Sequence, residues 1–198
     1  MVTAGASAGS ATFQLGGRIA DAVAVAGRRG GIEVTTTPIE LRDLGHDLVD
    51  RLLGEPQSDA LAAAADSVAA AEGLVVVTPT YNASFSGLFK LFIDVLPLQA
   101  LDGSAVLLAA TGGSGRHTLV LDQALRPLFA YLKAVVVPTS VFATQDSRVG
   151  GSAEAEALSQ RVERAAAELV AQMVASVRAR PQDRGELFGD LSPFSYGY

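Results

Sequence analysis

Short apolar runs alternate along the chain with longer stretches in which apolar residues recur every three to four positions. The short runs have the length and composition of strands buried on both faces, and they occupy residues 33–39, 74–78, 105–110 and 134–141. The longer stretches have the period of helices that cover a sheet, and they occupy residues 12–28, 59–72, 86–96, 119–132 and 154–180. This alternation predicts an α/β domain with a parallel sheet.

One further strand is expected before Gly5, although only residues 1–4 precede that glycine. Either this strand is very short or the natural chain begins several residues earlier. With it, the pattern fits a flavodoxin-like three-layer sandwich whose five-stranded parallel sheet has the order 2-1-3-4-5. We expect residues 1–180 to form this domain and residues 181–198 to form a polar C-terminal tail. Pro127 should kink or split the helix that contains it.

Three loops are predicted to meet beyond the carboxyl ends of the strands, where open parallel sheets bind their ligands. They read GASAGSAT (residues 5–12), PTYNASFSG (residues 79–87) and TGGSGRH (residues 111–117). In the first, Ser7, Ser10 and Thr12 lead into a helix, so hydroxyls, free amides and the positive helix end could hold a phosphate. An ordinary helix N-cap is the competing interpretation.

The first loop can be compared with two known motifs, a nucleotide-binding P-loop and a hydrolase nucleophile turn. It lacks the Gly-Lys-Ser/Thr ending of a nucleotide-binding P-loop. Residues 5–9 match the G-x-S-x-G pattern of a hydrolase nucleophile, but that turn follows several strands, whereas here four residues precede it. His46 and His117 are available as bases, yet nothing in the sequence places either beside Ser7. A serine hydrolase is therefore disfavoured.

The second loop is richer than a simple connection requires. Pro79 cannot extend the hydrogen-bond ladder, Tyr81 offers a flat face, and Asn82 tolerates turn geometry. A plain turn in which Ser84 or Ser86 caps the next helix would account for the serines, but not for the whole run. The pattern favours a pocket that holds a flat ligand against the backbone.

Composition narrows the function classes further. The net charge of −6, without a cluster of Lys or Arg, argues against nucleic acid as a main partner. The absence of cysteine excludes disulfides, thiolate nucleophiles and iron–sulfur clusters, and the presence of only two histidines argues against a multi-histidine metal site. No apolar run approaches the roughly 20 residues that span a bilayer, and no secretion signal opens the chain. We expect a cytoplasmic location.

The segment TPTYNASFSGLFKLFID resembles the P-x-Y-N-x-S-x-S-G-x-x-K-x-x-x-D motif of the NAD(P)H-dependent FMN reductases. The resemblance continues through LLAATGGSGRH and QALRPLFAYLKAVVVPTSVFA, so it covers about residues 2–144. It is nearest to the actinobacterial branch associated with luciferase-like monooxygenases. Three motifs in the same order are specific, whereas any one alone is weak.

The resemblance implies an FMN site made by the three loops, with NADPH or NADH as the reductant. The phosphate would be bound near Ser7, Ser10, Thr12, Phe13 and Gln14. The isoalloxazine edge would lie against Pro79, Thr80, Tyr81, Asn82, Ala83 and Ser84. Its pyrimidine side would face Thr111, Gly112, Gly113, Ser114 and His117, although His117 could instead cap the following helix or contact a partner subunit. Two departures stand out: many relatives have a basic residue near Thr12 and a glutamate at Thr80.

The resemblance also implies hydride transfer without an indispensable catalytic acid or base and without a metal. It implies a homodimer or tetramer, with residues 125–132 or 86–89 in the contact, and a flavin-dependent monooxygenase as a possible partner. Three alternatives stay open. They are a flavodoxin-like electron carrier, a quinone, azo or chromate reductase on the same scaffold, and a regulatory domain that has lost the flavin.

Overall fold

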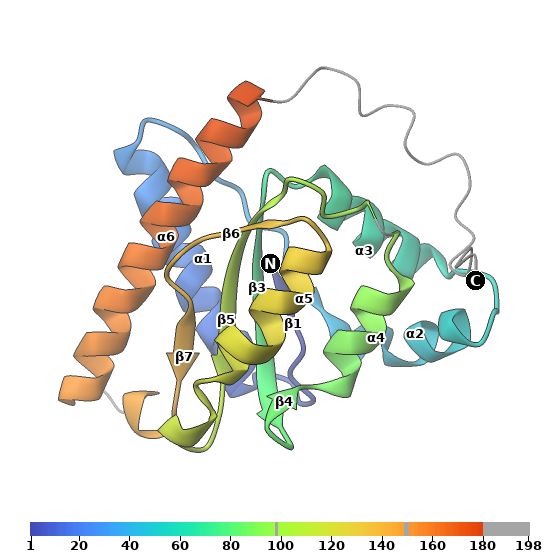
Figure 1. The fold of residues 1–198 in the computed structure, drawn as a ribbon, viewed down its shortest axis with the longest axis horizontal. Coiled ribbons are helices and arrows are strands. Elements are labelled where there is room, and N and C mark those ends of the chain that lie inside the picture. Colours follow the sequence, from blue (N-terminus) through green and yellow to red (C-terminus); the bar gives the residue numbers. More distant parts are fainter. Residues whose placement is uncertain (98, 149–150, 180–198) are drawn as a thin grey trace.

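A computed structural model shows the chain as a three-layer α/β sandwich and describes residues 1–97, 99–148 and 151–179 (Figure 1). The predicted tail at residues 181–198 lies outside the described residues. None of the helices in the described ranges is long and apolar enough to cross a membrane.

The central sheet has the predicted flavodoxin-like order, with two additions. Its main path is β2-β1-β3-β5-β6, and all of these strands are parallel. They are β1 (Val2–Thr3), β2 (Ile39–Glu40), β3 (Gly73–Tyr81), β5 (Ala105–Thr111) and β6 (Val135–Val136). Of the additions, β4 (Ser84–Phe85) forms an antiparallel hairpin with β3, and β7 (Val141–Ala143) pairs with β5.

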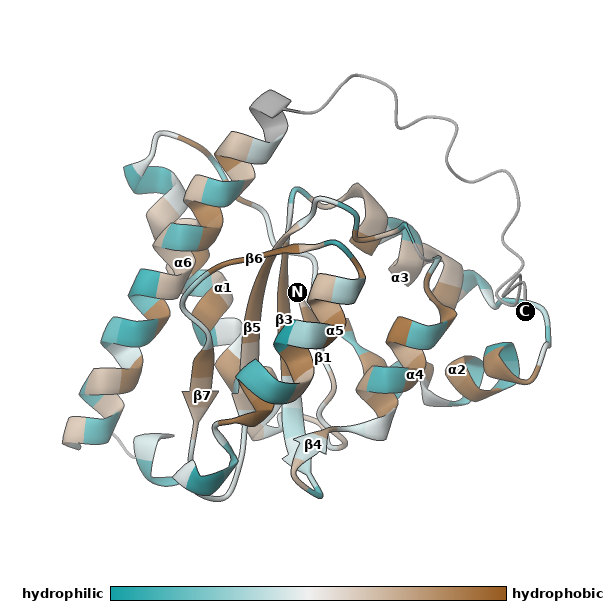
Figure 2. Cartoon of the chain, viewed as in Figure 1, coloured by the Kyte–Doolittle hydropathy of each residue, from teal (hydrophilic) through white to brown (hydrophobic). Residues whose placement is uncertain are grey.

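Helices cover both faces of this sheet. The helices α1 (Ala11–Arg29) and α6 (Ala153–Ala179) pack together on one face. The other face carries α2 (Gly45–Leu52), α3 (Asp59–Ala70), α4 (Gly87–Val95) and α5 (Arg126–Tyr131). Figure 2 shows the hydrophobic residues concentrated on the central strands and on the helix sides turned toward them.

The strand residues alternate between two hydrophobic cores, as strands buried on both faces must. In β3, Leu74 and Val76 join the core under α3, α4 and α5, whereas Val75 and Val77 join the core under α1 and α6. The near-continuous apolar runs that predicted these strands are therefore explained by helices on both sides. The three large rings of the first core, Phe89, Phe92 and Phe129, are each 1% exposed or less.

The structure divides one predicted helix and adds one helix that was not predicted. The stretch 119–132 is divided, as expected, into a π-helical turn (Leu121–Leu125) and α5. Pro127 lies in the first turn of α5, directly after the π-helical turn, and the fixed φ of proline suits this position. The sequence did not predict α2, which packs on α4. Because α2 shields them, Leu88 and Leu91 are half-buried within this chain, which accounts for much of the excess apolar character of α4.

Two predicted strands are paired over only part of their length. The run 134–141 is interrupted between β6 and β7 around Pro138, which cannot donate a ladder hydrogen bond. The run 33–39 pairs only from Ile39 onward, so the prediction of a regular strand from residue 33 is wrong for the chain as described. The physical reason is that β1 is only two residues long, so residues 33–36 have no backbone opposite them.

Candidate functional site

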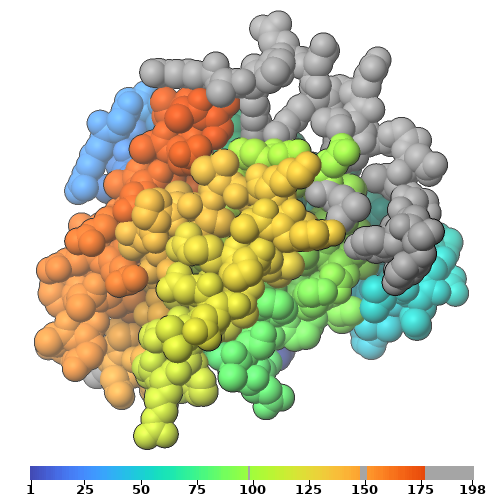
Figure 3. All heavy atoms as spheres, viewed as in Figure 1, coloured from blue at the N-terminus to red at the C-terminus, as the bar shows by residue number. Residues whose placement is uncertain are grey.

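The three predicted loops meet at the carboxyl end of the sheet. The Ala4 amide donates to the Val77 carbonyl at 2.9 Å, which places the first loop beside the end of β3. Pro79 lies opposite Thr111 in the β3–β5 pairing, so the second and third loops leave neighbouring strands. The Thr12 and Thr111 hydroxyl oxygens, 3.0 Å apart and buried, connect the first loop to the third. Figure 3 shows the β4 hairpin and the segment after β5 projecting at the lower edge of the molecule.

The first loop is folded tightly around Ser10. The Ser10 hydroxyl accepts a hydrogen bond from the Phe13 amide at 3.1 Å, so Ser10 is the N-cap of α1. The Gln14 side chain donates to the Gly9 carbonyl at 2.9 Å, which fixes the turn. A Cβ placed on Gly5 would lie 2.0 Å from the Ser10 Oγ, so only glycine fits there without a shift. Gln14 therefore supports the loop from within.

The amides of this loop are left available. Among the described residues, the amides of Ala6 to Gly9 and of Ala11 and Thr12 donate to no protein acceptor. They stand at the positive end of a 19-residue helix. Ser7 is exposed, whereas Thr12 is buried with its hydroxyl against Thr111. The loop is thus suited to an anionic oxygen group, with Ser7 and Ser10 as the reachable hydroxyls and Thr12 as an internal brace.

The second loop is a tight β-hairpin. Thr80 pairs with Phe85, and the two residues at the tip, Asn82 and Ala83, have φ angles of 48° and 65°. Two successive left-handed residues are the mark of a type I′ turn, which prefers Asn-Gly. Beside the tip, Tyr81 is 52% exposed. The hairpin therefore presents an aromatic face and a strained backbone at the end of the sheet.

The strain at Ala83 yields a prediction. We expect Ala83→Gly to raise the free energy of unfolding by about 1 kcal/mol, because glycine adopts a left-handed φ without the Cβ clash. Urea denaturation measures this. Lys133→Gly is a matched control, since Lys133 has a φ of 55° in a turn after α5. Both variants should be more stable than the unchanged protein. A loss of stability in Ala83→Gly alone would mean that contacts of the Ala83 methyl group outweigh its backbone strain.

The base of the hairpin is held by buried hydroxyls. The Ser86 amide donates to the Thr78 hydroxyl at 3.0 Å, and the Ser86 hydroxyl accepts from the Phe89 amide at 3.3 Å. Ser86 is thus the N-cap of α4, which decides between the two serines considered from sequence. The Thr80 Oγ1 is buried and has no hydrogen-bond partner among the described residues. Ser104 Oγ is the other buried side-chain atom without a partner in the described part of the chain.

The third loop depends on two glycines with different surroundings. The Gly112 amide donates to the Ala143 carbonyl at 3.1 Å, and a Cβ on Gly112 would lie 2.7 Å from the Phe142 ring. A Cβ on Gly113 would meet nothing within 4 Å. His117 closes a short 3₁₀ turn (Gly115–His117). Phe142 has a part in this loop that sequence reasoning missed, since nothing in a β-strand residue 30 positions away signals the contact.

The side chains of the site offer little acid–base chemistry. The only titratable residues in the three loops are Tyr81, Arg116 and His117. In the described portion of the chain, no group of three or more His, Asp or Glu side chains is placed to hold a metal ion. The site provides amides, hydroxyls, glycines and an aromatic face, with no carboxylate to repel an anion. This donor set fits a flat ligand with a phosphate tail, such as FMN.

Known proteins resemble this chain in sequence. A family model described as NADPH-dependent FMN reductase matches residues 1–149. The NADH-dependent FMN reductase SfnE of Pseudomonas putida is 44% identical over 131 residues, covering 64% of this chain and 70% of the relative. The FMN reductase (NADPH) of Pseudomonas aeruginosa is 40% identical over 114 residues, covering 58% and 61%.

Solved structures are similar in fold and in sequence. A crystal structure of an oxidoreductase from Corynebacterium diphtheriae superposes with a TM-score of 0.84 at 41% identity, covering 88% of this chain and 94% of that one. The apo form of the NADH:FMN oxidoreductase EmoB gives a TM-score of 0.67 at 31% identity, covering 83% and 86%.

Proposed function

Because the chain belongs to the NADPH-dependent FMN reductase family, we propose that it reduces FMN held by the three loops at the carboxyl end of its sheet. The observation on which this assignment rests is that the amides of Ala6 to Gly9, Ala11 and Thr12 donate to no protein acceptor among the described residues. The other two loops, at the same end of the sheet, contain few titratable residues. The chain is an oxidoreductase that uses FMN with NADH or NADPH.

In this proposal the first loop binds the phosphate. The amides between Ala6 and Gly9, the hydroxyls of Ser7 and Ser10, and the positive end of α1 supply the donors. No lysine or arginine lies in this loop, so affinity depends on hydrogen-bond geometry. Gln14 and Thr12 act indirectly, because one holds the Gly9 carbonyl and the other contacts Thr111.

The second and third loops orient the flavin ring. The hairpin from Pro79 to Ser84 would lie along one edge of the ring. The amides of Gly113 and Ser114 would face the pyrimidine side, where they would stabilise negative charge. Gly112 would set their position, since its own amide is bonded to Ala143.

When bound, FMN supplies the redox chemistry by accepting a hydride from the nicotinamide. The chain's contribution is to hold the reacting groups in contact, to favour the charge that develops, and to leave one ring face open to the nucleotide. No catalytic acid or base is assigned, in line with the few titratable residues in the loops.

Two finer proposals concern partners. We propose that reduced FMN leaves the site for a flavin-dependent monooxygenase, since the loops are exposed and Tyr81 at their edge is half-exposed. A homodimer or tetramer stays a prediction. In its suggested contact, Leu125 and Phe129 are fully buried in the chain's own core, whereas Tyr131 is 70% exposed and free to meet a second subunit.

The deciding experiment is anaerobic mixing of the protein with excess FMN and either NADH or NADPH, followed at the visible absorbance band of the flavin. We expect bleaching with at least one nucleotide at a rate proportional to protein concentration, and none without protein. FMN binding without bleaching would instead favour the electron carrier. If FMN does not bind, the assignment of the three loops is wrong.

A further inference from the structure

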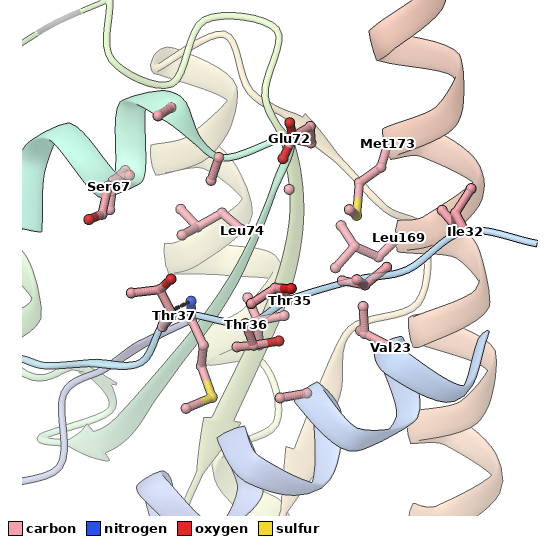
Figure 4. A pocket seen from close by; sticks show the side chains of 18 of the residues that line it. Val23, Ile32, Thr35, Thr36, Thr37, Ser67, Glu72, Leu74, Leu169 and Met173 are labelled. Carbon is pink, nitrogen blue, oxygen red and sulfur yellow. Dashed lines mark hydrogen bonds between the residues drawn. The ribbon is translucent and has the colours of Figure 1, made fainter. Parts of the chain in front are cut away.

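A cavity of about 710 Å³ lies at the amino end of the sheet, away from the three loops. Figure 4 shows it between residues 35–37, the start of β3 at Leu74, and the side of α6 at Met173. Among its described lining residues, the charged side chains are the carboxylates of Glu33 and Glu72. Because carboxylates repel an anion, this cavity does not suit a substrate that carries phosphate groups.

A second cavity, of about 400 Å³, lies at the carboxyl end of the edge strand β7. Thr144 and Ser147, which follow β7, line one side of it, and the first turns of α6 line the other. It also touches the third loop, because Thr118 directly follows the last turn of that loop. Phe142 lines the cavity as well, and its ring lies against Gly112. The second cavity is therefore next to the proposed flavin site, on the far side of the third loop from the hairpin.

Local hydrogen bonds fix the wall of the second cavity that faces α6. The Thr144 amide donates to the Ser147 Oγ at 2.9 Å, and the Ser147 amide donates to the Thr144 Oγ1 at 3.1 Å. The Thr118 hydroxyl donates to the Gly115 carbonyl at 3.0 Å. These hydroxyls are engaged within the protein, so the donors that a ligand can reach come chiefly from α6.

Two arginines of α6 face this cavity without a carboxylate partner. Arg161 and Arg164 are three residues apart, which makes their side chains neighbours on one face of the helix. Within residues 1–97, 99–148 and 151–179, neither forms an ion pair, and neither does Glu154, which also lines the cavity. The Arg161 Nε donates to the Ser140 carbonyl at 2.6 Å, which anchors that guanidinium. Two neighbouring cations repel each other, so an anion bound between them is stabilising.

The lining suits an anion that is attached to a flat ring. Guanidinium groups bind phosphate oxygens through paired hydrogen bonds, which a doubly charged phosphate can accept from both arginines. Phe142, Ala157 and Leu158 supply an apolar surface on which a purine ring can lie. NADPH carries a phosphate and a purine together at one end, and its 2′-phosphate is the group that NADH lacks.

We propose that the second cavity binds the adenosine 2′-phosphate end of NADPH, with Arg161 and Arg164 on the phosphate. This inference rests on the proposed function, because the nicotinamide end must reach a flavin held by the second and third loops. The cavity and the proposed flavin site share the third loop, so one nucleotide can span both. NADPH is then preferred to NADH, and the preference is set by α6 and not by the three loops.

The kinetic test uses Arg164→Gln, since Arg161 also holds the Ser140 carbonyl. We expect it to raise KM for NADPH about 10-fold, the loss of one hydrogen bond to a charged group, while KM for NADH and kcat stay unchanged. Arg164→Lys should recover part of the affinity, because it keeps the charge without the planar fork. Arg29→Gln is the matched control, since it removes the same charge from the exposed last turn of α1 and should change neither KM.

Calorimetric titration with adenosine 2′,5′-bisphosphate tests the cavity separately from flavin reduction. We expect this probe to bind the unchanged protein and Arg29→Gln equally, to bind Arg164→Gln about 10-fold more weakly, and to bind more tightly than adenosine 5′-monophosphate. Binding that depends on Arg164, in a protein that does not bleach FMN, would uphold the subsite and reject the reductase.

Two results would overturn the subsite and leave the reductase in place. One is an equal KM for NADPH and NADH that Arg164→Gln does not alter. The other is binding of inorganic phosphate as tight as that of the bisphosphate, which would show a site for free phosphate instead of a nucleotide.

Discussion

Gly5→Ala is expected to lower the affinity for FMN by 100-fold or more. A Cβ at this position would lie 2.0 Å from the Ser10 Oγ and 2.8 Å from the Ser10 Cβ. Ser10 must therefore move, which breaks its N-cap bond to the Phe13 amide. The first loop then opens, and the amides of residues 6–9 lose the positions in which they could bind the phosphate. A loss of 100-fold corresponds to about 2.7 kcal/mol of binding free energy, of the order of one or two hydrogen bonds to a charged group.

The measurement is quenching of FMN fluorescence on titration with protein. Gly17→Ala is the matched control, because it adds the same methyl group on α1 where nothing lies within 4 Å. Alanine in a helix interior should increase stability slightly, and FMN affinity should not change. If Gly5→Ala binds FMN as tightly as the unchanged protein, the phosphate does not lie in this loop, whatever happens to Tm.

The elements that could be predicted are those whose signal is local. The apolar runs of β3 and β5 and the periodicity of α1 and α6 identify these elements because each is long and repeats its pattern. The helix α2 was not predicted, because it has only eight residues and begins directly after a 3₁₀ turn. The strand at residues 33–39 was overpredicted because a strand also needs a neighbour, and the sequence of a segment does not say whether its partner is present.

In the candidate site, too, the local features could be predicted from the sequence and the long-range contacts could not. The loop sequences indicate hydroxyls, glycines and a turn, so the meeting of the three loops at one edge of the sheet could be predicted, whereas the binding of FMN by their residues stays a proposal. The contacts that fix the loops join residues far apart in sequence, such as Thr12 with Thr111 and Gly112 with Phe142. The hairpin tip could not be predicted with certainty, because Asn-Ala is a weaker signal for a type I′ turn than Asn-Gly. Long-range packing decides these details, and one sequence does not display it.

The second large effect is expected for Gly112→Leu. If the pyrimidine side of the flavin faces Gly112, as the family resemblance implies, a bulky residue there would block the ring directly. The structure shows that the added side chain would instead be directed at Phe142, 2.7 Å from the new Cβ. The loop must then move away from β7, and the amides of Gly113 and Ser114 move with it. Overpacking of this kind costs about 1–3 kcal/mol of stability.

We therefore expect Gly112→Leu to lower Tm by several degrees and to lower kcat/KM for the pyridine nucleotide by at least 100-fold, about 2.7 kcal/mol of transition-state stabilisation. Combining it with Phe142→Ala should restore part of both, because removing the ring makes room for the leucine and lets the loop return. Phe142→Ala alone reports the cost of losing the ring. Recovery of Tm without recovery of turnover would return the explanation to direct blocking of the flavin. A flavin-loaded Gly112→Leu variant with full turnover would place the flavin away from this loop altogether.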